Sequence, residues 1–532
     1  MAATLLTSRQ LAWNTESRMQ STFEKVAQPD YSLAGTVLLT TVVLSACAIR
    51  YGVYLMIPDN FNYIAYWEQL FEGSFRTTSL QTPKPLLVII FGALWRLTGS
   101  LVFLIVLFIG IGTLAAYGSA GIVIRMCGAA CGWSVLALLL PNAAFLRAVL
   151  AGYSEVISAA GAVWLIHHHL EVDRIRLPDR CTAVGLFALN LVRPDNWLLS
   201  AGVAIAAGTA IAVSPSRPCG LGSTLGQARH AVVDASFPLL APFIWIGFDY
   251  LAFGDPLYSF KTTAHFAEVA TATSAQIHWY AYFPELATSI RNQVSLFALG
   301  CAAIGVAVVS RRRPFLLILL GLPFITNVAF YFLTYIAGMA TYDRFFFVPV
   351  LMILVVSCIG LASATNWLQS FQMRLPRMPI ASSLRVVGKR VLVVAVLMLL
   401  LAMEHRNLPF KVSVFDTYAR WRISALSAAE AVRRDSDYGQ ATPVIVRVED
   451  LALVGWALRS DGRTLTDTLT YKREGARLSS EVRIAFFIIN QSHQGKLFPE
   501  LASGRLPGLH TNIIYDDWTT VVYKVARIPL NW

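Results

Sequence analysis

Residues 101–124 read LVFLIVLFIGIGTLAAYGSAGIVI, a run without a charged side chain. A helix needs about 20 mostly apolar residues to cross the hydrocarbon core of a bilayer, so this run is long enough to span a membrane. Ten other runs are similar or nearly so, and together they predict eleven spans, to within one or two. Those runs are 33–56, 127–146, 153–169, 181–193, 196–213, 231–252, 293–310, 314–337, 344–364 and 388–403.

The composition of the whole chain agrees with a polytopic membrane protein. Of its 532 residues, 56% are hydrophobic and 14% are charged, against about a quarter charged in an ordinary soluble domain. These values exclude a disordered chain, a fibrous protein and a single soluble enzyme. The net charge of +12 comes from short basic clusters between apolar runs, which indicates topology signals and contacts with anionic lipid rather than nucleic acid. None of the seven cysteines forms a C-x-x-C pair, so neither a disulfide framework nor a zinc site is indicated.

The basic loops predict the orientation of the chain, because cytoplasmic loops carry an excess of Lys and Arg. The apolar run 85–98 is short and ends in polar residues, and we interpret it as lying in the membrane interface. All basic loops then fall on the side of the N-terminus, in the cytoplasm, and an odd number of spans places the C-terminal segment outside the cytoplasm. The basic positions are Arg125, Arg174, Arg176, Arg180, the 214–230 loop, Arg311, Arg312, Arg313 and the 365–390 loop.

The predicted fold is an all-α polytopic membrane domain with interfacial helices and a small C-terminal α/β domain. We assign 1–32 to a cytoplasmic tail, 33–403 to the transmembrane domain with an outer loop at 57–100, and 404–532 to a water-soluble domain. That last segment holds 31 of the 74 charged residues. Its pattern predicts a helix over 412–438, strands at 444–446 and 484–489, and a hairpin over 513–525.

The outer loop begins with PDNFNYIAYWEQLFEG, residues 58–73. Tyr63, Ile64 and Trp67 share one face of a helix and polar side chains lie on the other, which predicts an amphipathic helix on the membrane surface. Asp59 stands at the start of this helix, where an Asp side chain commonly caps free backbone N–H groups. The capping role and a functional role both remain open from the sequence alone.

Ionisable residues gather at the outer ends of the spans, whereas the span centres are nearly free of charge. Each one has a local structural explanation, but together they predict a functional site at the outer interface. The three consecutive residues His167, His168 and His169 lie at a cytoplasmic span end and point in different directions, which favours an interfacial role over a metal site. The outer candidates are Asp59, Lys84, Glu155, Arg193, Asp195, Asp255, Lys261, His265, Asp343 and Arg344.

Several of these residues occur in short motifs that resemble the GT-C superfamily of membrane glycosyltransferases. Asp59 takes the place of the acid that follows the first span in that family. Lys84-Pro85-Leu86 resembles the family's Lys-Pro-Pro-Leu element, but this chain has one proline fewer there. Arg193-Pro194-Asp195 resembles an Arg-Pro-Glu element between later spans. Residues 253–257, Phe-Gly-Asp-Pro-Leu, resemble a Tyr-Gly-Asp-x-Leu element of the arabinofuranosyltransferase-like branch.

The resemblance implies transfer of a sugar from a polyprenyl-phosphate donor to an acceptor hydroxyl, with inversion. Asp59 would act as the general base and Glu155 as the second acid, while Lys84, Arg193 and Arg344 would contact the donor phosphate. The remaining donor- or acceptor-binding candidates are Asp195, Asp255, Lys261, His265 and Asp343.

The same resemblance implies a multi-pass protein of the inner cell membrane with an extracytoplasmic C-terminal domain. Its partners would be a polyprenyl-phosphate-linked sugar, a glycan, lipid or protein acceptor, and membrane lipids, with no nucleic acid. No cofactor is required, although outer carboxylates are compatible with a divalent cation. A polytopic lipid or solute transporter, such as a flippase, is the alternative, although repeated halves and polar segments at mid-membrane are not evident.

Overall fold

The computed structural model describes most of the apolar part of the chain and the core of the C-terminal segment. The described residues are 31–52, 56–72, 75–76, 82–128, 131–170, 179–213, 233–234, 236–263, 279–336, 343–374, 408–439, 442–446, 450–458, 465–467, 484–490, 509–517 and 520–527. The predicted span at 388–403 and the candidate residue His265 lie outside them.

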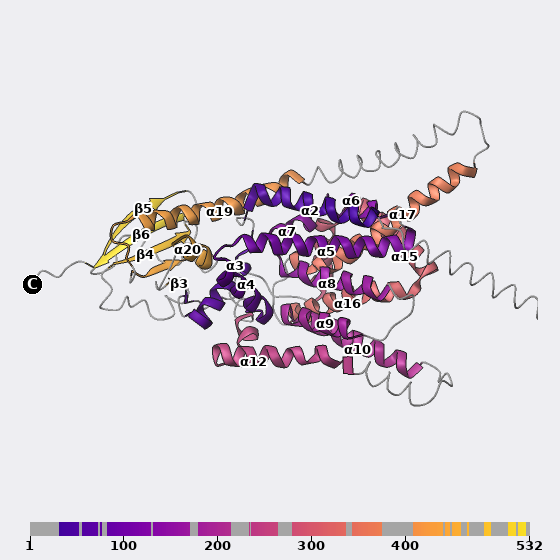
Figure 1. Cartoon of the computed structure of the whole chain (residues 1–532), viewed down its shortest axis with the longest axis horizontal. Coiled ribbons are helices and arrows are strands. Elements are labelled where there is room, and N and C mark those ends of the chain that lie inside the picture. Colours follow the sequence, from indigo (N-terminus) through magenta and orange to yellow (C-terminus); the bar gives the residue numbers. More distant parts are fainter. Residues whose placement is uncertain are drawn as a thin grey trace, which may run out of the picture.

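Helices make up the membrane part, and most run along the long axis of the molecule (Figure 1). A π-helical turn at Glu68–Glu72 extends α3, and a 3₁₀ turn at Asp343–Phe346 precedes α17. The helices are α2 (Tyr31–Tyr51), α3 (Pro58–Trp67), α4 (Pro85–Thr98), α5 (Val102–Cys127), α6 (Trp133–Leu139), α7 (Ala143–Leu150), α8 (Ser154–Leu170), α9 (Arg180–Val192), α10 (Asp195–Val213), α12 (Ala241–Phe253), α14 (Tyr282–Gln293), α15 (Leu296–Arg312), α16 (Pro314–Ile336) and α17 (Phe347–Arg374).

Fewer helices qualify as spans than the eleven that the sequence predicts. Within the described ranges, four helices are long and apolar enough to cross a membrane, or up to six if each of two bent helix pairs counts as one span. The predicted span 127–146 is one of these pairs, because the chain bends by 82° between α6 and α7. Pro141 cannot continue a helix, and the Asn142 side chain caps α7 by accepting a hydrogen bond from the Phe145 amide. Shorter apolar helices include α4 and α9, with 14 and 13 residues.

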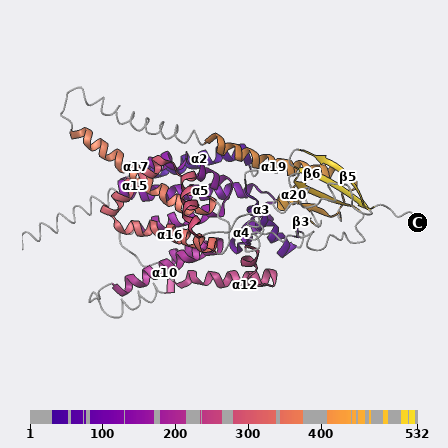
Figure 2. The same ribbon diagram turned by 180° about the vertical axis from the view of Figure 1, so that it is seen from behind.

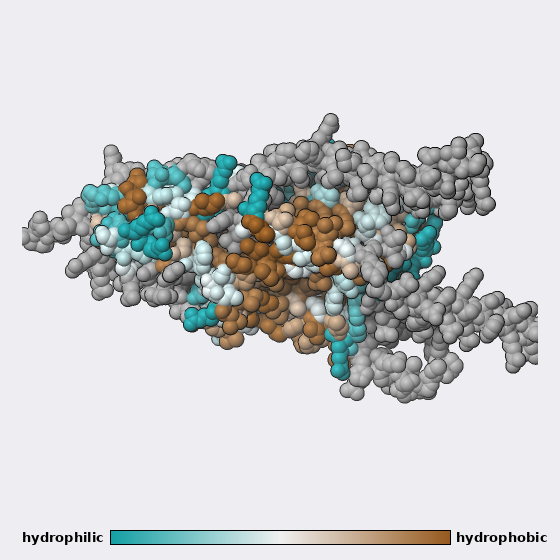
Figure 3. All heavy atoms as spheres, turned by 45° about the horizontal axis from the view of Figure 1, so that its top comes forward, coloured by the Kyte–Doolittle hydropathy of each residue, from teal (hydrophilic) through white to brown (hydrophobic). Residues whose placement is uncertain are grey.

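Small residues let the central helices pack closely. A Cβ on Gly360 of α17 would lie 1.8 Å from the Cys301 carbonyl oxygen of α15, and one on Gly305 would lie 2.1 Å from the Val356 oxygen. Close approach of backbones at small residues is the usual way in which membrane helices associate. The outward-facing side chains of this helical part are largely hydrophobic (Figure 3), as contact with lipid requires.

The C-terminal segment forms an α/β unit at one end of the bundle (Figures 1 and 2). The predicted strands at 444–446 and 484–489 and the hairpin are present as β2 (Val444–Val446), β4 (Ile484–Asn490), β5 (Leu509–Asp516) and β6 (Thr520–Arg527). The sheet also contains β3 (Leu465–Asp467) and has the order β1-β3-β2-β4-β6-β5. Two helices, α19 (Leu408–Arg434) and α20 (Leu451–Leu458), pack beside it.

The edge strand β1 (Phe75–Arg76) comes from the first outer loop and pairs in parallel with β3. Residues that are some 390 positions apart in the sequence therefore share one sheet, with Phe75 opposite Leu465. The first outer loop and the C-terminal segment consequently lie at the same end of the bundle.

The helix α3 lies between the bundle and the C-terminal unit (Figure 1). The prediction of an amphipathic helix on the membrane surface is wrong here, because residues 61–66 are all buried, Asn62 included. Helix α4 packs on one side and α20 on another, and Trp67 fits against Gly92, whose Cβ position lies only 2.0 Å from the indole ring. Because other helices cover α3 on several sides, this helix does not need a polar face toward water.

Candidate active site

The first turn of α3 places Asp59 at the centre of a charged cluster. The N-cap residue of the helix is Ile57, and it makes no side-chain cap hydrogen bond. Asp59 follows Pro58 inside the first turn, so the interpretation of Asp59 as the N-cap is wrong. Its carboxylate lies 3.3 Å from the Arg344 guanidinium, and the two side chains are 12% and 27% exposed.

Contacts with the turn between α7 and α8 fix the position of this helix start. The Ile57 amide donates to the Ala151 carbonyl at 2.8 Å, and Asn60 Nδ2 donates to the Gly152 carbonyl at 3.0 Å. Gly152 has a φ of 69°, and a Cβ there would lie 2.3 Å from Asn60 Nδ2, so both the conformation and the approach of Asn60 require glycine.

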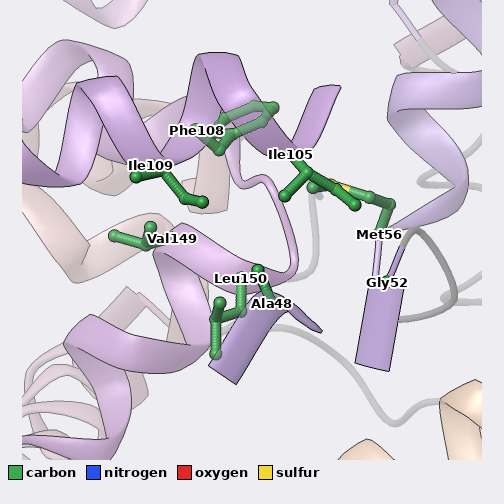
Figure 4. A pocket seen from close by; sticks show the side chains of 8 residues that line it. All are labelled: Ala48, Gly52, Met56, Ile105, Phe108, Ile109, Val149 and Leu150. Carbon is green, nitrogen blue, oxygen red and sulfur yellow. The ribbon is translucent and has the colours of Figure 1, made fainter. Parts of the chain in front are cut away.

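A small apolar pocket lies beside this turn, between α2, α5 and α7 (Figure 4). Its wall carries no charged side chain, and it therefore offers no group that binds a phosphate. The lining residues are Ala48, Gly52, Met56, Ile105, Phe108, Ile109, Val149 and Leu150.

Glu155 is the second acid of the cluster, in the first turn of α8. It is 2% exposed, and its Oε1 lies 2.6 Å from Arg193 and 4.0 Å from Arg344. Arg344 thus lies between the carboxylates of Asp59 and Glu155, which belong to different helices. The Arg147 guanidinium does not join this cluster and lies over the Tyr153 ring at 5.8 Å.

All three guanidinium nitrogens of Arg193 have partners. Its Nε donates to Asp195 at 2.9 Å, Nη1 donates to Ser154 at 3.1 Å and pairs with Glu155, and Nη2 donates to the Tyr331 hydroxyl. Asp195 in turn accepts from Asn327 Nδ2 at 2.9 Å. The ion pairs of Arg193 with Asp195 and Glu155 therefore hold the Glu155 carboxylate in place.

Lys84 differs from the other cations of the cluster in the partners of its charged group. It is the N-cap residue of α4, extended between Pro83 and Pro85, and its ammonium donates to Ser154 Oγ at 2.5 Å and lies 5.7 Å from the centre of the Tyr63 ring. Among the residues that the structure describes, none places a carboxylate oxygen within 4.0 Å of it. Burial and, to a smaller extent, the neighbouring Arg193 guanidinium lower the pKa of Lys84 to about 8.

Four of the sequence candidates lie apart from this cluster or outside the described residues. Asp255 and Lys261 pair with each other at 2.6 Å, and the Lys261 side chain is 65% exposed. Asp343 precedes Arg344, but its carboxylate accepts a hydrogen bond from Ser289 at 2.6 Å. His265 is not among the described residues.

The three-histidine run makes local contacts at the opposite end of the bundle. His168 lies 2.9 Å from Asp179, and His169 lies 3.1 Å from the Thr182 hydroxyl. No group of three or more His, Cys, Asp or Glu residues that could hold a metal ion occurs among the described residues.

Sequence reasoning did not assign a role to Ser154, Tyr63, Asn327 or Tyr331. Ser154 directly precedes the candidate Glu155 in the sequence, and its hydroxyl accepts hydrogen bonds from both Lys84 and Arg193. Asn327 and Tyr331 lie one turn apart on the predominantly apolar α16, and that spacing was the available signal.

Solved structures resemble the chain in fold, whereas no protein-family model and no curated protein sequence matches it. ArnT from Cupriavidus metallidurans bound to undecaprenyl phosphate is 14% identical, with a TM-score of 0.53 over 92% of this chain and 97% of that chain. The apo state of the same protein is 13% identical, with a TM-score of 0.50 over 92% and 98%. The archaeal oligosaccharyltransferase AglB from Archaeoglobus fulgidus, in complex with an inhibitory peptide and a dolichol-phosphate, is 11% identical, with a TM-score of 0.46 over 94% and 75%.

The similarity to the two ArnT structures extends over almost the whole of both chains. The chain therefore has the fold of these ArnT structures, and the charged cluster is built on that fold.

Proposed function

We propose that the protein is an integral membrane glycosyltransferase that moves a sugar from a polyprenyl-phosphate donor to an acceptor hydroxyl. The observation that carries the proposal is the Lys84 ammonium, a largely enclosed cation without a carboxylate partner in the described structure, in a cluster that contains Asp59 and Glu155. The Asp59 and Glu155 carboxylates act on this ammonium only from a distance, and a phosphate would offer it a direct charge-assisted hydrogen bond. One of the structures that shares the fold, ArnT, is bound to undecaprenyl phosphate.

The carboxylate of Asp59 supplies a base for the acceptor. The acceptor hydroxyl gives its proton to Asp59 as its oxygen attacks the anomeric carbon, and the bond from that carbon to the phosphate oxygen breaks. The electron pair leaves with the polyprenyl phosphate. Because attack and departure occur on opposite faces of the carbon, the configuration is inverted and no covalent enzyme intermediate forms.

The cations divide into two roles. Lys84 and Arg344 face the space around Asp59, and they stabilise the negative charge that grows on the leaving phosphate. Arg193 is fully engaged with Glu155, Asp195, Ser154 and Tyr331, so it keeps Glu155 ionised and oriented toward the sugar or the acceptor. Two side-chain cations at the phosphate supply the charge that a divalent cation would otherwise bring, and we propose that no cofactor is required.

The site end of the bundle faces away from the cytoplasm in this proposal. Arg125 and Arg312 lie at the ends of α5 and α15 that are opposite to the Asp59 cluster. An excess of basic residues marks the cytoplasmic side of a membrane protein. The C-terminal unit shares a sheet with the first outer loop, so it too lies outside, and the protein resides in the inner cell membrane of its source.

Binding and transfer assays test the function separately. Purified protein should bind undecaprenyl phosphate in detergent, and Lys84→Met should weaken that binding at least tenfold, whereas Arg291→Met should leave it unchanged because Arg291 is an exposed cation on α14. Mass spectrometry of lipid that co-purifies with the protein identifies the sugar for the transfer assay. Equal affinity in the wild type and Lys84→Met would refute the phosphate site, and substrate flux into sealed vesicles without sugar transfer would favour a transporter.

A further inference from the structure

The side of α3 that faces away from Arg344 contacts a buried cation of the C-terminal unit. The guanidinium of Arg422, on α19, lies 5.3 Å from the centre of the Phe61 ring. Phe61 is fully buried, and Arg422 is only 3% exposed. A guanidinium over an aromatic face is attracted by the ring quadrupole, more strongly when the pair is shielded from water.

A second residue of the C-terminal unit holds this guanidinium in place. Arg422 Nη1 forms an ion pair with Asp450, whose side chain is 4% exposed and which directly precedes α20. Helix α20 itself packs against α3. On the same face of α19, one turn earlier, Ala419 packs with Ala48 and Leu150 of the bundle. The two helices α19 and α20 therefore contact α3 and the adjacent bundle together.

Phe61 and Asp59 point to opposite sides of α3, so a contact at Phe61 affects the position of Asp59. Successive residues of a helix are about 100° apart, so two residues separate the directions of their side chains by about 200°. Arg422 therefore supports α3 on the side opposite to the one from which Asp59 reaches Arg344. The helix has no side-chain cap at its start, so tertiary contacts of this kind and those of Asn60 determine where Asp59 lies.

We infer that Arg422, held by Asp450, is a positioning residue that sets Asp59 at the reaction centre through the Phe61 ring. The inference rests on the proposed function, because it assigns the C-terminal unit a part in the transfer reaction. A displacement of about 1 Å of a reacting group can cost about 10²-fold in rate. A small shift of α3 after loss of the Arg422 contact is therefore sufficient to lower kcat.

The test removes the cation without leaving a buried charge. Arg422→Met alone would leave the Asp450 carboxylate unpaired, so the double variant Arg422→Met/Asp450→Leu is compared with it. Both should lower kcat about 10–10²-fold with an unchanged dissociation constant for undecaprenyl phosphate, and Arg422→Lys should restore much of the rate because it keeps a cation at the ring. Lys524→Met is the matched control, because Lys524 pairs with Asp435 at 2.7 Å in the same unit.

Combination with Asp59→Asn distinguishes positioning from general stability. If Arg422 acts through Asp59, the double variant Arg422→Met/Asp450→Leu should cause no further loss of kcat once Asp59 has been replaced. An equal loss in both backgrounds, or wild-type kcat in the double variant, would overturn the inference. If Arg422→Met does not fold, Phe61→Leu provides the same comparison, because it removes only the ring.

Hydrogen exchange separates this inference from the proposed function. The double variant should raise amide exchange in α3 by at least tenfold and leave exchange in α4 unchanged, and this readout does not need a substrate. Faster exchange in α3 in a protein that transfers no sugar would refute the proposed function alone. Unchanged exchange in α3 would refute the positioning role even if transfer is observed.

Discussion

The protonation of Lys84 should control the affinity for a lipid phosphate above neutral pH. Burial lowers the pKa of this lysine from 10.5 to about 8, whereas a bound phosphate raises it again because the opposite charge favours the ammonium form. Between these two pKa values, a proton has to be taken up for the phosphate to bind. The dissociation constant should therefore rise about tenfold between pH 7 and pH 9.

The stability of the folded protein does not change with pH in the same direction as the affinity for the lipid phosphate. The folded pKa of Lys84 lies below the unfolded value, so the unfolded chain binds the proton more tightly and this residue adds to the stability as the pH rises from about 8 toward 10.5. The contribution of Lys84 to stability thus increases over the interval in which affinity falls. A phosphate monoester has already lost its second proton well below pH 8, because that pKa is about 6, so the ligand does not titrate there.

The assay is a titration of detergent-solubilised protein with undecaprenyl phosphate at pH 7, 8 and 9. Lys84→Arg is the informative variant, because a guanidinium stays protonated throughout this interval. It should bind with an affinity that does not change with pH. A flat profile in the wild-type protein, or the same slope in Lys84→Arg, would refute the assignment of Lys84 to the phosphate.

Three further outcomes are expected. Asp59→Asn should lower kcat about 10²–10⁴-fold with little change in melting temperature, because Ile57 is the N-cap and the pair with Arg344 is partly exposed; wild-type turnover would leave Asp59 with a structural role only. Treatment with EDTA should leave transfer unchanged, because Lys84 and Arg344 carry the positive charge at the phosphate, and a loss that Mg²⁺ restores would contradict this. In a cysteine-free background, an impermeant thiol reagent should label Ser436→Cys in intact cells but label Ser310→Cys only after lysis, since the two exposed positions lie on the C-terminal unit and on the basic end of α15; the reverse pattern would invert the topology.

The sequence alone determined the membrane character and much of the candidate site. Charged side chains are costly in a bilayer, so the few that occur beside apolar runs stand out against their surroundings. Asp59, Lys84, Glu155, Arg193 and Arg344 were visible for this reason, and the structure brings them together. Short motifs also predicted the fold, and residues 85–98 were too short to span a membrane, in agreement with the 14-residue helix α4.

The number of spans and the C-terminal unit were predicted less completely. Hydropathy measures how apolar a run is but not whether the helix is straight. The prediction of eleven spans therefore did not include the bend at Pro141 and Asn142. The hairpin and two strands followed from β-branched runs. The two-residue strand β1 did not, because its only support is a partner strand far along the chain.

Only the tertiary structure decided which charges are already paired. Ion pairing depends on distances between segments that are separated by 38 to 285 residues in the chain, and the sequence does not contain those distances. Arg193 and Lys84 look alike as outer cations, yet Arg193 has its donor groups engaged and Lys84 has only a hydroxyl and a ring as described partners. In the same way, the burial of α3 and the contact of Arg422 with Phe61 exist because the C-terminal unit folds back onto the first outer loop. Residue types were sufficient to locate the site, but their roles follow from neighbours that only folding brings together.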